Sequence, residues 1–217
     1  AGIRHQPRSR GLGDVYKRQF QKRSEGSPSD AYHKSGELRN YHDTEPSMDE
    51  NGKVNEDKQR EIIHGYMASV SFIDAQLGLI LDHLKSLGMD KNTVVVFFGD
   101  HGWHLGDHGL WNKHSNFEEA TRTPLIFKSP DLEGGFINDS PVELLDIFPT
   151  VCTLAGIPKP DDLDGISLVP ILEKKSEYLR EIPCESIVCI NLRSSSSKAL
   201  LKLSLSNSFF SNSNSLI

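Results

Sequence analysis

Apolar residues mark a long element in the middle of the chain. From Glu56 to Leu87 they recur at intervals of three and four, which is the spacing of one face of an α-helix. Gly88 follows and suits the left-handed residue that ends many helices. The pattern predicts a helix with one buried stripe, formed by Ile62, Tyr66, Val70, Ile73, Leu77, Ile80, Leu81 and Leu84.

Two shorter apolar runs predict strands. Thr93–Phe98 is rich in β-branched and aromatic residues, which is typical of a strand buried on both faces inside a parallel sheet. Thr123–Lys128 is a second run, with Pro124 near its start, where a missing N–H is tolerated. Because a long helix followed by a short turn and a buried strand is typical of βαβ units, we expect an α/β fold.

A second helix is predicted after these strands. Ser140 can serve as its N-cap, Pro141 as its first residue and Glu143 as the third residue of a capping box. Pro149 lies inside the pattern and should kink the helix or divide it in two, and Gly156 should end it.

The flanking segments have a different character. Residues 1–19 are basic and aperiodic, so we expect a non-native or disordered tail. Residues 20–55 are rich in Ser, Gly, Pro, Asp and Glu, which indicates a polar surface segment. Residues 173–217 become a poorly defined, low-complexity tail rich in Ser and Asn. Residues 56–172 therefore hold the predicted core of the chain.

Composition narrows the classes of function. The chain has 217 residues, a net charge of −6 and a hydrophobic content of 36 %. It has no basic stripe with interleaved aromatic residues, which argues against nucleic-acid binding. No apolar stretch reaches the roughly 18 residues of a membrane span. The three cysteines, Cys152, Cys184 and Cys189, form no Cys-x-x-Cys pair and are interpreted as small buried thiols.

Candidate chemistry gathers directly after the first predicted strand. The sequence Gly99–Asp100–His101–Gly102 places a carboxylate beside an imidazole, a common pair of metal ligands. Lys113 stands twelve residues beyond His101 and could fold back as a point charge for an anionic ester. Other loop residues could be hydrogen-bonding partners around such a site, wall a pocket, stack on a sugar or simply pack the loop: Trp103, His104, His108, Trp111 and His114.

The segment from Gly99 to Ile126 resembles the second metal-site segment of the sulfatases, and is most similar to iduronate-2-sulfatase and its relatives. The resemblance extends upstream through the helix that contains Tyr66–Gly78 and downstream through Val142–Pro158 and Asp164–Pro170, so it covers about residues 56–172. It implies an α/β fold of the alkaline-phosphatase and sulfatase type, with a sheet flanked by helices, and hydrolysis of the sulfate esters of glycans such as iduronate 2-sulfate, or of small sulfate esters. It further implies a lysosomal, secreted or periplasmic location.

The same resemblance implies roles for individual residues. Asp100 and His101 match ligands of a calcium ion, and Lys113 matches a lysine that contacts the sulfate. Calcium prefers oxygen ligands, so His101 alone would point to zinc or manganese; the resemblance favours calcium. The nucleophile of the family is a formylglycine made from the cysteine of a Cys-x-Pro-x-Arg motif, which is absent here. The resemblance thus implies the central-to-C-terminal part of a sulfatase, an incomplete fold whose N-terminal half must come from elsewhere in the protein.

Two alternatives remain open from the sequence. Phosphodiesterases and phosphatases of the same superfamily also place Asp-His-Gly after a buried strand, usually with two zinc ions and a Thr or Ser nucleophile. The other alternative is a truncated fragment without catalytic function. The part of the protein that carries the nucleophile would discriminate between sulfatase and phosphatase.

Because the formylglycine cysteine is absent, we expect the purified 217-residue chain to have no sulfatase activity of its own. Release of sulfate from 4-nitrophenyl sulfate or a sulfated sugar measures this. Turnover above a buffer blank would contradict the expectation.

Overall fold

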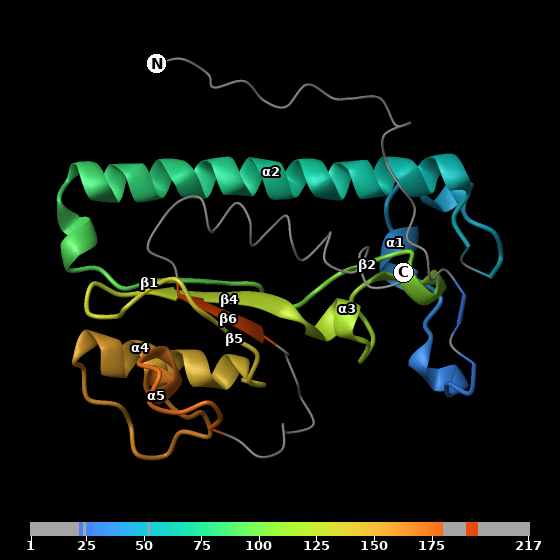
Figure 1. Cartoon of the computed structure of the whole chain (residues 1–217). Helices are drawn as coiled ribbons and strands as arrows, with labels where there is room; N and C mark the ends of the chain where they lie inside the picture. The colour runs from blue at the N-terminus through green and yellow to red at the C-terminus, as the bar shows by residue number, and fades with distance from the viewer. Residues whose placement is uncertain (1–21, 24, 52, 180–189, 195–217) are drawn as a thin grey trace, which may run out of the picture. The chain divides into compact units, whose positions relative to one another are not determined.

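The structure, a computed structural model, describes residues 22–23, 25–51, 53–179 and 190–194 (Figure 1). Contacts divide the chain into two compact units, residues 1–71 with 103–115 and residues 72–102 with 116–217. We describe each unit by itself. The expected tail at residues 1–19 and most of the Ser-rich end lie outside the described residues.

The second unit is built on a four-stranded mixed sheet with the order β1-β4-β6-β5 (Figure 1). Its strands are β1 (Val95–Phe98), β4 (Thr123–Lys128), β5 (Ile137–Asn138) and β6 (Ile190–Ser194). β4 pairs antiparallel with β1 and parallel with β6. Strand β6 falls in the region for which the sequence predicted no element.

The two strand predictions had different outcomes. The predicted bounds of β4, with Pro124 as its second residue, are confirmed. For β1 the strand is confirmed, but its predicted burial on both faces inside a parallel sheet is wrong. The strand is partly exposed, with Phe98 at 47 %, and it pairs antiparallel with β4. Among the described residues β1 pairs only with β4, so its other edge has no neighbouring strand to bury it.

The core of this unit lies between β4 and two helices, α4 (Ile147–Ala155) and α5 (Val169–Leu172) (Figure 1). Leu125 and Phe127 of β4 are fully buried there. The remaining buried members of the cluster are Val142, Leu168, Ile171 and Leu172. Burying these side chains is the main favourable contribution to the stability of the unit.

The helix predicted from Ser140 starts later than expected. A short 3-10 turn, Leu144–Asp146, precedes α4, and its N-cap is Glu143 in a capping box with Asp146. Pro149 therefore lies in the first turn of α4, where its missing N–H costs no hydrogen bond. The predicted helix is divided in two, as one of the two expected outcomes, but the division falls before Ile147 and not at Pro149. Gly156 has φ 67° and ends the helix as predicted.

Two buried side chains tie this region to the segment before α5. The Asp146 carboxylate accepts hydrogen bonds from the backbone N–H groups of Glu143 (2.9 Å) and Ile166 (2.8 Å). The Thr150 hydroxyl accepts one from the N–H of Leu168 (2.8 Å). Both side chains are fully buried, so these bonds satisfy groups that water cannot reach.

Gly165 lies where the segment before α5 packs against the start of α4. A Cβ atom placed on it would lie 2.1 Å from the carbonyl oxygen of Leu145. Since that oxygen belongs to the backbone, it cannot move away cheaply. The close approach of the two segments therefore requires glycine at this position.

The long helix α2 (Glu56–Ser86) confirms the predicted helix, and Gly88 has φ 69° at its end. The predicted stripe is less buried than expected: six of its eight residues are half-buried, and Ile73 and Ile80 are exposed. Ile73 is 50 % and Ile80 64 % exposed, and only Lys58, Gln59 and Ile63 of the helix are buried. Periodicity predicts which residues share a face of the helix. Among the described residues, however, too few side chains pack on that face to cover it fully.

The first unit contains the polar segment that the sequence placed on the surface. It forms a 3-10 turn (Ser29–Ala31), α1 (Gly36–Arg39) and another 3-10 turn (Glu45–Ser47). It is not only surface, since Leu38 and Val54 are buried. The Gln59 amide of α2 donates a hydrogen bond to the Val54 carbonyl oxygen (2.7 Å), which fixes the segment on the start of the helix.

Lys58 adds an electrostatic contact at the same place. Its Nζ lies 2.6 Å from Asp43 Oδ2 and 3.0 Å from Glu61 Oε2. Burial alone would lower the pKa of Lys58, but hydrogen bonds to Asp43 and Glu61 outweigh it, so the pKa is raised. The lysine therefore stays charged while largely buried.

The remaining elements frame the loop that carries the candidate chemistry. In the first unit β2 (His104–Leu105) and β3 (Trp111–Asn112) form a small antiparallel pair around the 3-10 turn Asp107–Gly109. In the second unit α3 (Glu118–Thr121) precedes β4, and the 3-10 turn Met89–Lys91 precedes β1. Within the described ranges, no helix has the length and apolar character needed to cross a bilayer.

The contact at Gly165 predicts a specific mutational effect. Gly165→Ala should destabilise the second unit by about 1–3 kcal/mol, because its Cβ would overlap the Leu145 backbone. Hydrogen exchange of the β4 amides measures the loss. Gly78→Ala in α2 is the matched control, since a Cβ there meets no atom within 4 Å and should be neutral or mildly stabilising. Equal protection in both variants would refute the proposed close contact.

Candidate functional site

The Gly99–Gly102 turn follows β1 and is fixed by the backbone of its neighbours. The N–H of Gly99 donates to the Pro124 carbonyl oxygen (3.1 Å), and that of Gly102 donates to the Ala120 carbonyl oxygen (2.7 Å). The turn is thus bonded to the beginning of β4 at one end and to α3 at the other.

Steric contact adds to these hydrogen bonds. A Cβ atom at Gly99 would lie 2.0 Å from Thr123 Oγ1, and one at Gly102 would lie 2.2 Å from the Glu119 carbonyl oxygen. Gly102 therefore requires glycine, because the atoms it would meet belong to the backbone, whereas a Cβ at Gly99 would force the Thr123 side chain to shift. These contacts give the two glycines of the Gly-Asp-His-Gly pattern a physical reason. The backbone of the two residues between these glycines, Asp100 and His101, is therefore held in place.

Asp100 and His101 occupy that fixed backbone. His101 Nδ1 lies 2.8 Å from the Gly102 carbonyl oxygen, and because a carbonyl only accepts, Nδ1 carries the hydrogen. In the neutral ring Nε2 then holds a lone pair, and it lies 3.6 Å from Asp100 Oδ2. A backbone carbonyl that fixes the tautomer in this way is usual for histidines that bind metals.

Two such ligands are fewer than a metal ion needs. In the part of the chain that the structure describes, no three His, Cys, Asp or Glu side chains form a group that could hold a metal. The Asp100 side chain is 83 % exposed, so its carboxylate is accessible to further ligands. The pair fits one side of a cation site and does not complete it.

A second cluster lies in the first unit around Glu37 of α1. Lys113 Nζ donates a hydrogen bond to Glu37 Oε1 (3.1 Å), and His114 Nε2 donates one to Glu37 Oε2 (3.0 Å). The Lys113 ammonium also lies 5.3 Å from the centre of the Trp103 ring, a cation–π distance. Trp103 in turn stacks on Tyr66 of α2, with ring centres 6.3 Å apart.

Charge in this cluster stabilises the Glu37 carboxylate. Burial opposes its ionisation, but hydrogen bonds and charge from Lys113 and His114 outweigh burial, so the pKa of Glu37 is lowered. The carboxylate therefore remains an anion at neutral pH and holds the lysine in one place. A lysine side chain on a four-carbon stem would otherwise sample many rotamers.

The other predicted loop residues have separate positions in the first unit. His104 is fully buried in β2, with Nε2 2.7 Å from Ser115 Oγ. His108 has φ 55° in the turn between β2 and β3 and lines a pocket. The structure thus gathers Lys113, Trp103 and His114 around Glu37, and pairs Asp100 with His101 in the second unit.

Sequence reasoning missed Glu37 and Tyr66 as members of the cluster. Glu37 is one of many acidic residues in a polar segment and lies 76 residues from Lys113, so no local pattern marks it. Tyr66 was assigned to the buried stripe of α2. Its spacing indicates the right helical face but gives no sign of an aromatic partner.

Comparison with known proteins decides the family. The sequence model of the family described as "Sulfatase" matches residues 16–157, which is more than half of the chain. The chain belongs to the sulfatase family. A sulfatase of Formosa agariphila is 41 % identical over 56 % of the chain, and the iduronate 2-sulfatase of Mus musculus is 38 % identical over 50 %. This sulfatase chain spans about a quarter of the length of these curated relatives, 24 % in both cases.

Solved structures show the same fold. A phosphonate monoester hydrolase from Silicibacter pomeroyi matches 64 % of the sulfatase chain and 26 % of its own, with a TM-score of 0.55 and 28 % identity. A 2-O GAG sulfatase matches 82 % of the chain and 38 % of its own, with a TM-score of 0.55 and 24 % identity. The predicted α/β class of the alkaline-phosphatase and sulfatase type is confirmed.

The family match begins earlier than the resemblance found in the sequence. That resemblance started at residue 56, whereas the match starts at residue 16 and includes the polar segment with Glu37. The contact between Glu37 and Lys113 is therefore a contact between two parts of the family region.

The lowered pKa of Glu37 predicts a pH dependence. A carboxylate with a depressed pKa stabilises the folded state above its ordinary value of about 4, and this contribution is lost as pH falls through the lowered pKa. Between about pH 5 and about pH 3, the unfolding free energy of the wild-type chain should fall more steeply than that of Glu37→Gln. At pH 7 the variant should be less stable by on the order of 1 kcal/mol.

Urea unfolding followed by tryptophan fluorescence measures this effect, because both tryptophans of the chain, Trp103 and Trp111, lie in the first unit. Glu50→Gln, at an exposed position, is the matched control and should follow the wild-type curve. Parallel pH curves for wild type and Glu37→Gln would show that the carboxylate contributes nothing at this site.

Proposed function

We propose that this chain is part of a sulfate ester hydrolase that acts on sulfated glycans. In this proposal Asp100 and His101 bind a divalent cation, and Lys113 contacts the sulfate group. Residues 56–172 supply the central-to-C-terminal part of the catalytic domain, and the formylglycine nucleophile comes from a part of the protein outside these residues.

The Gly99–Gly102 turn is the observation that carries the proposal. Gly102 is packed against backbone too tightly for any side chain, Gly99 is packed against Thr123, and the carbonyl oxygen of Gly102 sets the tautomer of His101. A turn held this firmly presents a carboxylate oxygen and an imidazole nitrogen 3.6 Å apart. Preorganised ligands of this kind are what a cation needs to bind without a large ordering cost.

The identity of the ion is the finer part of the proposal. The carboxylate of Asp100 suits calcium, and the family resemblance favours it, although the imidazole of His101 also suits zinc or manganese. A bound divalent ion would neutralise charge on the sulfate oxygens as the ester bond breaks.

Lys113 can add to that neutralisation. Its ammonium is held at 3.1 Å from Glu37 and over the Trp103 ring, so its position is defined before a substrate binds. A preplaced cation stabilises developing negative charge without reorganising in the transition state. The stacked Trp103 and Tyr66 rings next to it could face a sugar.

Named relatives support a glycan substrate. They include iduronate 2-sulfatase of Mus musculus at 38 % identity and an N-acetylglucosamine-6-O-sulfatase of Bacteroides thetaiotaomicron at 33 %. One neighbour, the phosphonate monoester hydrolase, favours a second candidate function on phosphorus esters. Assays with both ester types distinguish the two.

The proposal is tested in the polypeptide that joins this chain to the segment supplying the formylglycine. Asp100→Asn and Lys113→Ala should each lower kcat/KM for a sulfated glucosamine by about 100-fold or more, because Asp100→Asn weakens binding of the cation and Lys113→Ala removes the ammonium, and both positive charges stabilise the transition state. Metal content, measured by mass spectrometry of the dialysed protein, should fall in Asp100→Asn and stay unchanged in Lys113→Ala.

Exposed residues of the second unit provide matched controls. Asp162→Asn and Lys159→Ala make the same chemical changes at exposed positions and should retain full activity. Wild-type rates for Asp100→Asn and Lys113→Ala would refute the assigned roles. Faster turnover of a phosphonate monoester than of any sulfate ester would favour the second candidate function.

A further inference from the structure

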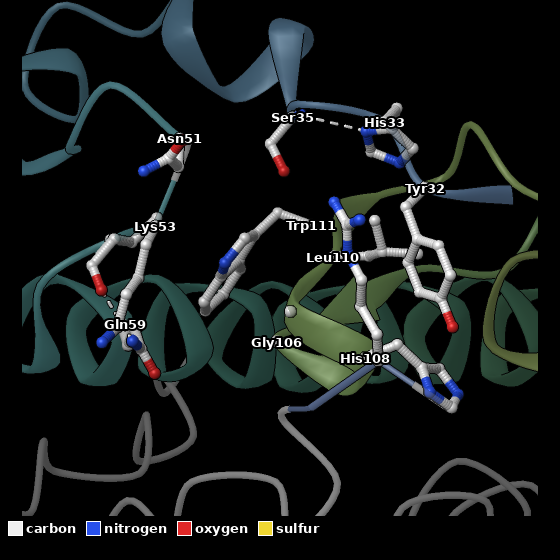
Figure 2. Close-up of a pocket in the computed structure, with 13 residues that line it drawn as sticks. Tyr32, His33, Ser35, Asn51, Lys53, Gln59, Gly106, His108, Leu110 and Trp111 are labelled. Carbon is white, nitrogen blue, oxygen red and sulfur yellow. Dashed lines mark hydrogen bonds between the residues drawn. The ribbon is translucent and has the colours of Figure 1, made fainter. Parts of the chain in front are cut away.

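The first unit contains a pocket of about 240 Å³ that is distinct from the Glu37 cluster (Figure 2). It lies between the N-terminal segment, the start of α2 and the turn between β2 and β3. We call it the basic pocket and define it by Arg23, Tyr32, His33, Lys53, His108 and Trp111.

Charge in the basic pocket has one sign. Arg23 and Lys53 are cations, and none of the described residues that line the pocket is Asp or Glu. The chain as a whole carries a net charge of −6. A site with two cations and no carboxylate in an acidic protein favours an anionic ligand.

Aromatic side chains accompany these cations. The Arg23 guanidinium lies 4.7 Å from the centre of the Tyr32 ring, which orients its planar group. Trp111 provides a second aromatic ring, and Figure 2 shows Tyr32 and Trp111 on either side of Leu110. Rings of this kind provide apolar faces for the C–H groups of a sugar, so the pocket combines anion recognition with carbohydrate stacking.

His33 supplies a hydrogen-bond donor in the wall of the pocket. Its Nδ1 accepts a hydrogen bond from the N–H of Ser35 (3.0 Å), so the neutral ring carries its hydrogen on Nε2. Burial, and then the charge of His114, lower the pKa of His33 and favour this neutral form. Nε2 is buried and has no hydrogen-bond partner in the described protein, which is costly unless a ligand provides one.

The same histidine links the basic pocket to Lys113. The His33 and His114 rings meet edge to face, with centres 6.0 Å apart. His114 and Lys113 share the Glu37 carboxylate. A ligand with two anionic groups could therefore contact Lys113 with one of them and the basic pocket with the other.

We propose that the basic pocket binds a second anionic group, a sulfate or a uronate carboxylate, of the glycan whose reacting sulfate lies at Lys113. This inference rests on the proposed function. It makes the enzyme selective for glycans with more than one negative charge over simple sulfate esters.

Titration of the 217-residue chain, followed by NMR, tests the inference with three probes. They are a glucosamine with one sulfate, a glucosamine with two sulfates, and a uronate–glucosamine disaccharide with one sulfate. The second or third probe should bind about tenfold more tightly than the first, since it gains charge-assisted hydrogen bonds. The probe that binds more tightly than the first shows whether the second anionic group is a sulfate or a carboxylate.

The double variant Arg23→Gln/Lys53→Gln should lose this gain and bind all three probes with equal affinity. Lys22→Gln/Lys34→Gln removes two exposed charges from the same segment and should keep the gain. Equal affinity of the wild-type chain for all probes, or a gain that survives Arg23→Gln/Lys53→Gln, would overturn the inference.

Lys113→Ala separates this inference from the proposed function. It should weaken binding of all three probes by a similar factor and leave the gain intact. Unchanged binding in Lys113→Ala would contradict the sulfate contact, while loss of the gain in Arg23→Gln/Lys53→Gln would still support the basic pocket. The reverse result would support Lys113 and overturn the pocket.

Discussion

Close backbone contact between the Gly99–Gly102 turn and the segment from α3 to β4 is the constraint on which the candidate metal ligands depend. Two hydrogen bonds and two contacts that exclude a Cβ atom hold the turn. β4 is in turn fixed by strands on both sides and by a core in which Leu125 and Phe127 are fully buried. The backbone position of Asp100 and His101 is therefore set by contacts of the glycines on either side of them.

Local patterns predicted the elements of the fold better than their surroundings. Residues 123–128 and the helix from Glu56 were predicted from periodicity and glycine signals, which act within a few residues. The degree of burial of β1 and of the α2 stripe was not predicted correctly, because burial depends on which distant segments cover a face. Glu143 and Asp146 replace Ser140 at the helix start, and Asp146 also accepts a hydrogen bond from the N–H of Ile166, a partner 20 residues away that no local pattern indicates.

The candidate site shows the same division between local and distant information. Asp100, His101 and Lys113 were predicted from residue type and spacing, and the fixed tautomer of His101 is consistent with the chemistry expected of it. Glu37 was not found, because its role depends on a contact across 76 residues. The basic pocket was missed for a related reason: Arg23, Lys53 and Trp111 come from three separate parts of the chain and have no shared sequence pattern.

Asp146 and Thr150 have a consequence for the chain between α4 and α5. Their side chains accept hydrogen bonds directly from the backbone amides of Ile166 and Leu168. The register of α4 against the segment before α5 is therefore set by these bonds and does not depend on the connector between them. Residues 157–162 of that connector are exposed. Its length and composition are thus open to variation, and it is a permissive place to insert a tag or a spectroscopic label without disturbing the core.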